Sequence, residues 1–178
     1  MSGNSVTNPG PHRARFDRTL AFLQSSVAPP AKILDLGIDN PFSQDMRHAG
    51  YEVENTIGQD LDDDFEQVAQ SDADIITAFE IFEHLVAPYN VLKAIKAPHL
   101  VATVPLKLWF VDAYWNEEDP WDRHYHEFED RQFDMVLEKA GWTIQHKEKW
   151  TFPVKKIGFR PLLRNITPRY YAVYCTRV

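Results

Sequence analysis

Hydrophobic and polar positions follow two alternating patterns along the chain. Continuous apolar runs, such as ADIITAF at 73–79, are typical of buried parallel strands, whereas apolar residues spaced three and four apart predict helices. The predicted strands are 31–37, 51–58, 73–79, 99–105, 142–152 and 170–178. The helical apolar positions fall within 16–27, 42–50, 88–95 and 133–140, with Pro29-Pro30, Gly50 and Gly141 as stops.

Strands that alternate with helices predict an α/β fold. We expect a Rossmann-like, mainly parallel sheet with helices on both faces. Residues 153–169 have no strong helical pattern, so the last two strands could pair antiparallel at one edge of the sheet. A length of 178 residues suits one domain. We place this domain at 13–178, after a flexible N-terminal tail at 1–12 that is rich in Gly, Pro, Asn and Ser.

Composition limits which cellular compartments and which types of site are possible. Cys175 is the only cysteine, which excludes an internal disulfide and a thiolate zinc cluster. No apolar run approaches the roughly 20 residues of a membrane span, so no transmembrane segment is expected. The N-terminus has no apolar stretch typical of a secretory signal. We therefore expect a cytoplasmic protein.

Charge divides the chain unevenly. The net charge is −7, but no acidic residue follows Glu148, whereas seven basic residues lie from Lys149 onward. This basic C-terminal part could contact an anionic surface, or it could dock onto the acidic body of the protein. An acidic chain is not expected to bind nucleic acid. The pattern leaves the oligomeric state open.

Polar residues follow two of the predicted strands, where an open α/β sheet binds its ligands. The first strand ends in Asp35-Leu36-Gly37, and a glycine there allows a tight turn and a close approach to a ligand. Glu80, Glu83 and His84 come directly past the strand at 73–79. These groups are costly to bury without a ligand or partner. The alternatives are a turn glycine beside a capping aspartate, and charged residues that merely open a solvated helix.

The order of these motifs resembles that of small class I S-adenosylmethionine-dependent methyltransferases. The resemblance covers residues 31–142 and rests on ILDLG, GYEVENTIGQDLD, ADIITAFEIFEHLVAPYNVL, LVATVP and HYHEFEDRQFDMVLEKAGW. It implies a seven-strand-type sheet with S-adenosylmethionine lying across the strand ends. The implied cofactor-binding residues are Asp35 and Gly37 at the methionine and ribose side, Asp60 and Leu61 near the adenine or ribose, and Phe79 and Glu80 in the pocket wall.

The resemblance also implies a side for the acceptor. His84 would lie at the mouth of the cofactor pocket, and His124 and His126 would lie in the substrate-side segment. Methyl transfer from a sulfonium needs mainly proximity and orientation, with a base only where the acceptor must lose a proton. We expect His84 or His124 to be that base.

Two features depart from the family pattern. After Gly37 the chain reads Ile38-Asp39-Asn40-Pro41, where the family usually has further glycines. Residues 38–72 are too few for two further complete strand-helix units, since a βαβ unit alone needs about 30 residues. We therefore expect one strand-helix unit to be shortened, which leaves open whether Asp60 ends the second or the third family strand.

The segment 108–129 mixes aromatic and acidic residues. Its aromatic members could form a substrate lid or pack over the sheet edge; they are Trp109, Phe110, Tyr114, Trp115 and Trp121. His124 and His126 beside Glu127 have the composition of a metal cluster. Because no clear third ligand accompanies the two histidines, we expect no metal site.

Together these features predict S-adenosylmethionine-dependent methyl transfer to a small-molecule or glycan-type acceptor. The alternative is a methyltransferase-like binding or scaffold protein that no longer uses the cofactor, which the glycine-poor loop favours. A nicotinamide-dependent oxidoreductase would need G-x-G-x-x-G after the first strand, and the chain lacks this motif.

Overall fold

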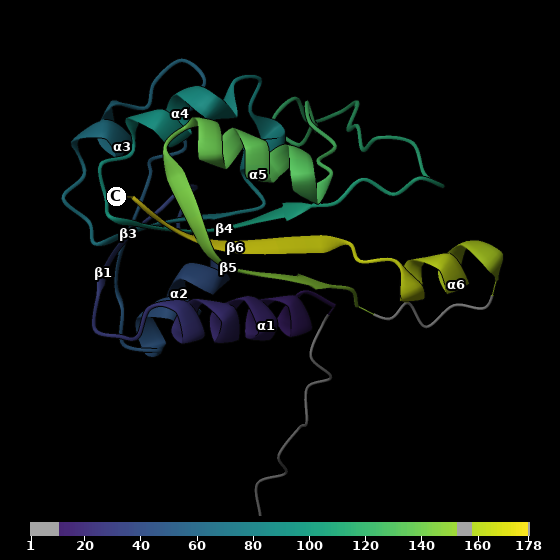
Figure 1. The fold of residues 1–178 in the computed structure, drawn as a ribbon, viewed down its shortest axis with the longest axis horizontal. Coiled ribbons are helices and arrows are strands. Elements are labelled where there is room, and N and C mark those ends of the chain that lie inside the picture. Colours follow the sequence, from purple (N-terminus) through teal and green to yellow (C-terminus); the bar gives the residue numbers. More distant parts are fainter. Residues whose placement is uncertain (1–10, 153–157, 178) are drawn as a thin grey trace, which may run out of the picture.

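The computed structural model describes residues 11–152 and 158–177. Helices and strands alternate along the first two thirds of the chain (Figure 1). The elements are α1 (Pro11–Ser26), β1 (Lys32–Asp35), α2 (Pro41–His48), β2 (Glu52–Asn55), α3 (Glu66–Gln70), β3 (Ile75–Phe79), the 3₁₀ helix η1 (Phe82–His84), α4 (Pro88–Ala94), β4 (His99–Pro105), α5 (Asp130–Lys139), β5 (Trp142–Trp150), α6 (Phe159–Ile166) and β6 (Tyr170–Arg177).

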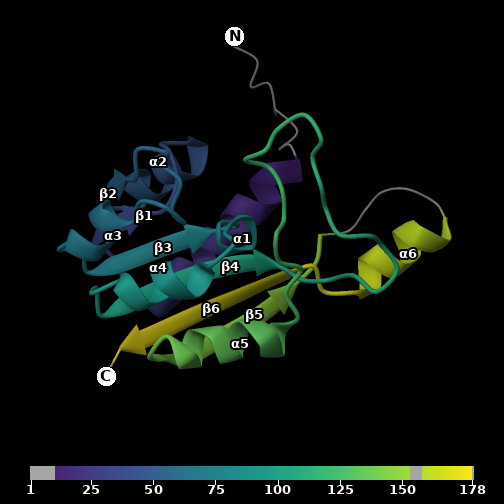
Figure 2. The same cartoon turned by 90° about the horizontal axis from the view of Figure 1, so that it is seen from above.

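A single six-stranded sheet has the order β2-β1-β3-β4-β6-β5 (Figure 2). Strands β2, β1, β3 and β4 are parallel, β6 pairs antiparallel with β4, and β5 pairs antiparallel with β6. The predicted fold class, a mainly parallel Rossmann-like sheet with an antiparallel C-terminal edge, is therefore confirmed.

Two apolar layers enclose the sheet. Helices α1 and α2 cover one face, and α3, α4 and α5 cover the other (Figure 1). On the first side Leu23 and Met46 pack against Ile33 of β1, and all three side chains are fully buried. On the second side Phe133 of α5 packs with Phe82 at a ring separation of 5.9 Å. This two-sided burial explains why the parallel strands are apolar at nearly every position.

The predicted shortening of one strand-helix unit is also confirmed. Strand β2 lies at the edge of the sheet, and residues 56–74 between β2 and β3 contain only the five-residue helix α3. The sheet therefore has six strands where the resemblance implied seven. Asp60 lies in this irregular connection and ends neither strand.

Other boundaries differ from the sequence predictions. Helix α1 already begins at Pro11, inside the segment predicted as a tail, and residues 1–10 lie outside the described part. Helix α6 was not predicted, because prolines argued against it. Pro161 lies in its first turn, where a missing amide N–H removes no helical hydrogen bond. Among the described residues, no helix is both long and apolar enough to cross a membrane.

Candidate active site

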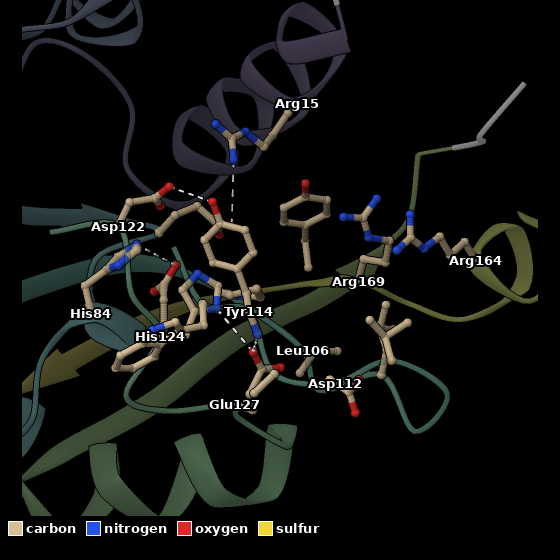
Figure 3. A pocket seen from close by; sticks show the side chains of 18 residues that line it. Arg15, His84, Leu106, Asp112, Tyr114, Asp122, His124, Glu127, Arg164 and Arg169 are labelled. Atoms are coloured by element: carbon tan, nitrogen blue, oxygen red, sulfur yellow. Dashed lines mark hydrogen bonds and ion pairs between the residues drawn. The ribbon is translucent and has the colours of Figure 1, made fainter. Parts of the chain in front are cut away.

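Three cavities adjoin one another beyond the carboxyl ends of β1, β3 and β4. The loop cavity, of about 370 Å³, is bordered by the β1–α2 turn and includes Gly37 and Glu80. The acidic cavity, of about 570 Å³, includes Gly37 and Asp60. The histidine cavity, of about 590 Å³, includes Glu80 and His124 (Figure 3). Gly37 thus borders the first two cavities, and Glu80 borders the first and third.

The turn after β1 depends on Gly37. Its φ of +127° lies in a region that favours glycine, and its N–H donates a 2.7 Å hydrogen bond to Oγ1 of Thr56. Asn40 then caps α2, because its Oδ1 accepts from the N–H groups of Phe42 and Ser43. A polar cap and a proline start to α2 therefore replace the further glycines of the family pattern.

Ile38 does not close the loop cavity. Its side chain is 63% exposed, and its Cγ2 lies only 2.8 Å from the position that a Cβ would take at Gly58. The bulky residue is thus accommodated because the chain has a glycine opposite it. Ile38, Asn40 and Pro41 border the loop cavity and leave it open.

Asp35 is buried beneath this turn, and its carboxylate is engaged by the protein. Oδ1 accepts from the Thr77 hydroxyl at 2.6 Å, and Oδ2 accepts from Ser43 Oγ at 3.3 Å and Asn55 Nδ2 at 3.1 Å. Burial raises the pKa of Asp35 to about 7, although these three hydrogen bonds act in the opposite direction. With its oxygens occupied in this way, the carboxylate fixes the loop after β1.

Glu80 lies at the end of β3 in an unusual backbone conformation, with φ at +58°. Its Oε1 accepts from Thr103 at 2.9 Å, and Oε2 lies 3.7 Å from Nη1 of Arg15 on α1. Burial raises its pKa, and the charge of Arg15 opposes the rise. A non-glycine residue with positive φ at a strand end is typical of a functional constraint. Phe79, directly before it, borders the loop cavity and meets the Phe42 ring edge-on at 5.2 Å.

Asp60 and Leu61 border the acidic cavity, across from the residues that follow η1. Asp60 Oδ1 accepts from the N–H of Asp62, which closes a tight acidic turn. The carboxylate of Asp62 in turn accepts from the N–H groups of Val86 and Ala87 at 2.7 and 2.8 Å. This pair of bonds ties the turn to the start of α4 and shapes the cavity between them.

Glu83, His84 and His124 form a cluster at the wall of the histidine cavity. Glu83 is 1% exposed, and its Oε1 lies 3.7 Å from Nε2 of His84. Burial raises the pKa of Glu83 well above its usual value, and the nearby Glu80 adds to the rise. The rings of His84 and His124 meet edge to face at 4.9 Å. Burial lowers the pKa of His84, which favours a neutral imidazole.

His126 is not part of this cluster. Its Nε2 lies 3.1 Å from the carbonyl oxygen of Val86, and its ring stacks on Phe128 at 5.2 Å. The structure thus separates the two histidines that the sequence placed together on the substrate side. His124 borders the histidine cavity, whereas His126 fixes the segment behind it.

The segment 108–129 contributes walls to two cavities. Tyr114 and Trp115 border the histidine cavity, and Trp121 and Tyr125 border the acidic cavity. Trp109 is 73% exposed and borders neither of these cavities. The aromatic residues therefore do not form one cluster over the sheet edge.

Sequence reasoning missed the basic side of the histidine cavity. Arg15 from α1, Arg164 from α6 and Arg169 before β6 all border it, together with Tyr170 (Figure 3). The only signal was the basic character of the C-terminal part. The basic C-terminal part was alternatively expected to dock onto the acidic body. Lys149 follows this alternative, because it forms a surface ion pair with Asp130. Lys155 and Lys156 lie outside the described residues.

Solved structures with the same fold were found, whereas no family model and no curated protein sequence matches the chain. A S-adenosylmethionine-dependent methyltransferase from Mesorhizobium loti is 16% identical with a TM-score of 0.62, over 92% of this chain and 98% of that one. A methyltransferase from Archaeoglobus fulgidus is 13% identical with a TM-score of 0.62, over 94% and 95% of the two chains.

A third structure contains ligands. The N-terminal domain of EvdMO1, in the presence of S-adenosylhomocysteine (SAH) and D-fucose, is 14% identical with a TM-score of 0.52. The match covers 100% of this chain and 89% of that one. Identities this low show the fold alone. The chain has the fold of class I S-adenosylmethionine-dependent methyltransferases.

Proposed function

We propose that this protein transfers a methyl group from S-adenosylmethionine to a small-molecule or glycan-type acceptor. The observation that carries the proposal is that three cavities at the carboxyl edge of the sheet adjoin one another and share Gly37 and Glu80 as lining residues. A cofactor across the first two cavities would present its sulfonium toward the third. The fold places the cavities where open α/β sheets bind ligands.

The proposed cofactor site joins the loop cavity and the acidic cavity. Gly37, Phe79 and Glu80 would surround the methionine end, and Asp60 with Leu61 would face the adenosine end. The carboxylate of Asp35 already has three hydrogen bonds within the protein, so we propose that its role is to maintain the shape of the loop. Its contact with the cofactor would be indirect.

The proposed acceptor site is the histidine cavity. Arginines on one side and carboxylates on the other suit a polar acceptor with several hydroxyl groups, and Tyr114 and Trp115 offer flat faces. A neighbour with the same fold was crystallised with a sugar, D-fucose. His84 and His124 border this cavity, and we propose them as the catalytic residues that would take the proton of an acceptor hydroxyl.

Calorimetric titration of the full chain with S-adenosylmethionine, with SAH and, in parallel, with NAD tests the cofactor. We expect binding of the first two at one site and no binding of NAD. A His84→Ala variant should keep the affinity for S-adenosylmethionine and lose turnover. If NAD binds and S-adenosylmethionine does not, the proposed function is wrong.

A binding protein without cofactor chemistry is the second candidate. It is favoured by the internal hydrogen bonds of Asp35 and by the lack of further glycines after Gly37. In this case neither S-adenosylmethionine nor NAD would bind, whereas polar ligands would still bind in the histidine cavity. The same titrations separate the two candidates.

A further inference from the structure

We propose that Glu83, His84 and His124 bind a divalent transition-metal ion at the wall of the histidine cavity. One ligand atom from each of these residues lies within 4.8 Å of the others. The sequence predicts no metal site, because no clear third ligand accompanies His124 and His126. The structure supplies it from Glu83, which lies on a different segment and is buried against the two imidazoles.

The hydrogen bonds of both histidines leave the same ring nitrogen available. Nδ1 of His84 lies 3.1 Å from the carbonyl oxygen of Arg123, which can only accept, so Nδ1 carries the proton. Nδ1 of His124 lies 3.3 Å from Oε1 of Glu127 and donates to it in the same way. With the proton on Nδ1, the neutral form of each imidazole keeps the lone pair on Nε2. Metal-binding histidines usually have such a partner on their other nitrogen.

These outer partners are themselves held in place. Glu127 Oε1 also accepts from the N–H of Tyr114 at 2.9 Å, and the guanidinium of Arg123 donates to the carbonyl of Asn116 at 3.0 Å. The carbonyl of Glu83 accepts from the N–H of Tyr125 at 2.8 Å. The segment with Glu83 and His84 is therefore tied to the segment with His124, which fixes the relative position of the three ligands.

Glu83 gives the independent observation that points to a cation. Its Oε2 is buried and has no hydrogen-bond partner among the described residues. Glu80 and Glu83 both line the histidine cavity, so two carboxylates face the same space. A buried carboxylate without a partner is costly, and a divalent ion would offset this cost for both carboxylates. A bound proton is the alternative, and the experiment below separates the two.

Two imidazole nitrogens and one carboxylate oxygen define the class of ion. This ligand set suits Mn²⁺, Fe²⁺ or Zn²⁺ and leaves coordination positions open. The ligand atoms lie within 4.8 Å of one another, and typical ligand distances of about 2.0–2.2 Å would require them to move inward on binding. Because His84 and His124 border the histidine cavity, the open positions would face the acceptor.

The role of the ion in methyl transfer rests on the proposed function, whereas metal binding itself does not. An acceptor hydroxyl on the ion would lose its proton to water more easily. The resulting oxygen would form a bond to the methyl carbon as the bond from that carbon to sulfur breaks, releasing SAH. The two histidines would then act on the acceptor through the ion.

The test uses the full chain, stripped with a chelator and without S-adenosylmethionine. MnCl₂ is titrated while electron paramagnetic resonance follows the free ion, and Co²⁺ absorption reports the ligand set. We expect one ion per chain, and an affinity at least tenfold weaker in Glu83→Gln and His124→Ala. His126→Ala is the matched control, because His126 lies on the same segment outside the cluster, and its affinity should equal that of the wild type.

Two results would overturn the proposal. One is the absence of metal binding by a folded wild-type chain, which would indicate that the buried carboxyl of Glu83 binds a proton in place of the ion. The other is undiminished binding by folded Glu83→Gln and His124→Ala variants, which would place the ion elsewhere, for example on the acidic turn at 60–64. Circular dichroism establishes that each variant is folded. If metal binds but S-adenosylmethionine does not, the proposed function fails and the metal site stands.

Discussion

The hydroxyl of Thr77 donates a 2.6 Å hydrogen bond to Oδ1 of Asp35, which joins the middle of β3 to the carboxyl end of β1 inside the protein. Asn55 at the end of β2 donates to Oδ2 of the same carboxyl. Three neighbouring parallel strands are therefore linked by one buried acid. Directly above it the chain turns at Gly37, so the charge state of Asp35 and the shape of the loop are coupled.

This coupling predicts how stability depends on pH. Burial raises the pKa of Asp35 to about 7, from about 3.9 in an unfolded chain. Between these values the folded state binds more protons, so the free energy of unfolding falls as pH rises, by at most about 1.4 kcal/mol per pH unit. Asp35→Asn lacks this titration. Urea unfolding from pH 4 to pH 8 should therefore give a steeper decline for the wild type.

Other buried acids do not obscure this comparison. Glu80 and Glu83 also have raised pKa values, and they contribute the same slope to both proteins. The difference between the two stability curves therefore isolates Asp35. Parallel curves over the whole range would show that Asp35 is ionised in the folded protein, with the Thr77, Ser43 and Asn55 hydrogen bonds outweighing burial.

Replacement of Gly37 tests the proposed cofactor site. With φ at +127°, any other residue is strained by about 1–3 kcal/mol, and Gly37→Ala should lower stability by that amount. Because the turn borders both proposed cofactor cavities, we also expect at least tenfold weaker binding of S-adenosylmethionine by calorimetry.

Gly141 offers the matched control for this change. It also has positive φ, at +94°, and an added Cβ would meet nothing within 4 Å. Gly141→Ala should thus be strained in a similar way at a position outside the three cavities, with unchanged affinity for S-adenosylmethionine. Equal loss of affinity in both variants would show that general destabilisation, and not the turn, is responsible.

We expect Arg177, near the end of the chain, to stabilise the folded protein at a place away from the candidate site. Its Nη2 donates to the carbonyls of Leu92 and Lys93 at 2.8 and 3.0 Å, which end α4, and its guanidinium lies 4.8 Å from the Trp142 ring centre. A cation that satisfies helix-terminal carbonyls is stabilising. Arg177→Ala should lower the free energy of unfolding by about 2 kcal/mol in urea.

An exposed arginine provides the comparison. Arg18 forms a surface ion pair with Glu148, and such pairs contribute about 1 kcal/mol or less. Arg18→Ala should therefore be clearly milder than Arg177→Ala. If the two variants lose the same stability, the bonds of Arg177 to the end of α4 contribute nothing beyond a surface charge.

The sequence predicted the sheet well for a physical reason. Strands β1, β3 and β4 are covered by helices on both faces, so burial imposes continuous apolar runs that can be read without a structure. The chain length between β1 and β3 similarly limited what could fit there, which is why the shortened unit could be anticipated. Helix α6 was not anticipated, because prolines within residues 153–169 argue against a continuous helix, although Pro161 is tolerated in its first turn.

The candidate site was harder to predict because its parts come from distant segments. Asp35 and Gly37 could be proposed from the sequence, since a strand end and a glycine are local signals. Glu83 and His124 come together only in the tertiary structure. The segment that carries His124 has almost no regular secondary structure, so no periodic pattern could indicate its position. The arginines of the histidine cavity come from both ends of the chain, and no spacing in the sequence relates Arg15 to Arg169.

Tryptophan fluorescence offers a direct view of the acidic cavity. Trp121 borders this cavity together with Asp60, so an adenine bound there would lie close to the indole and change its emission. We expect S-adenosylmethionine to change the emission of the wild type, and the change to be largely lost in Trp121→Phe. Trp109→Phe is the control, because Trp109 is exposed and borders neither the acidic nor the loop cavity, and this variant should respond as the wild type does. An unaltered response in Trp121→Phe, with calorimetry showing normal binding, would move the adenosine end out of the acidic cavity.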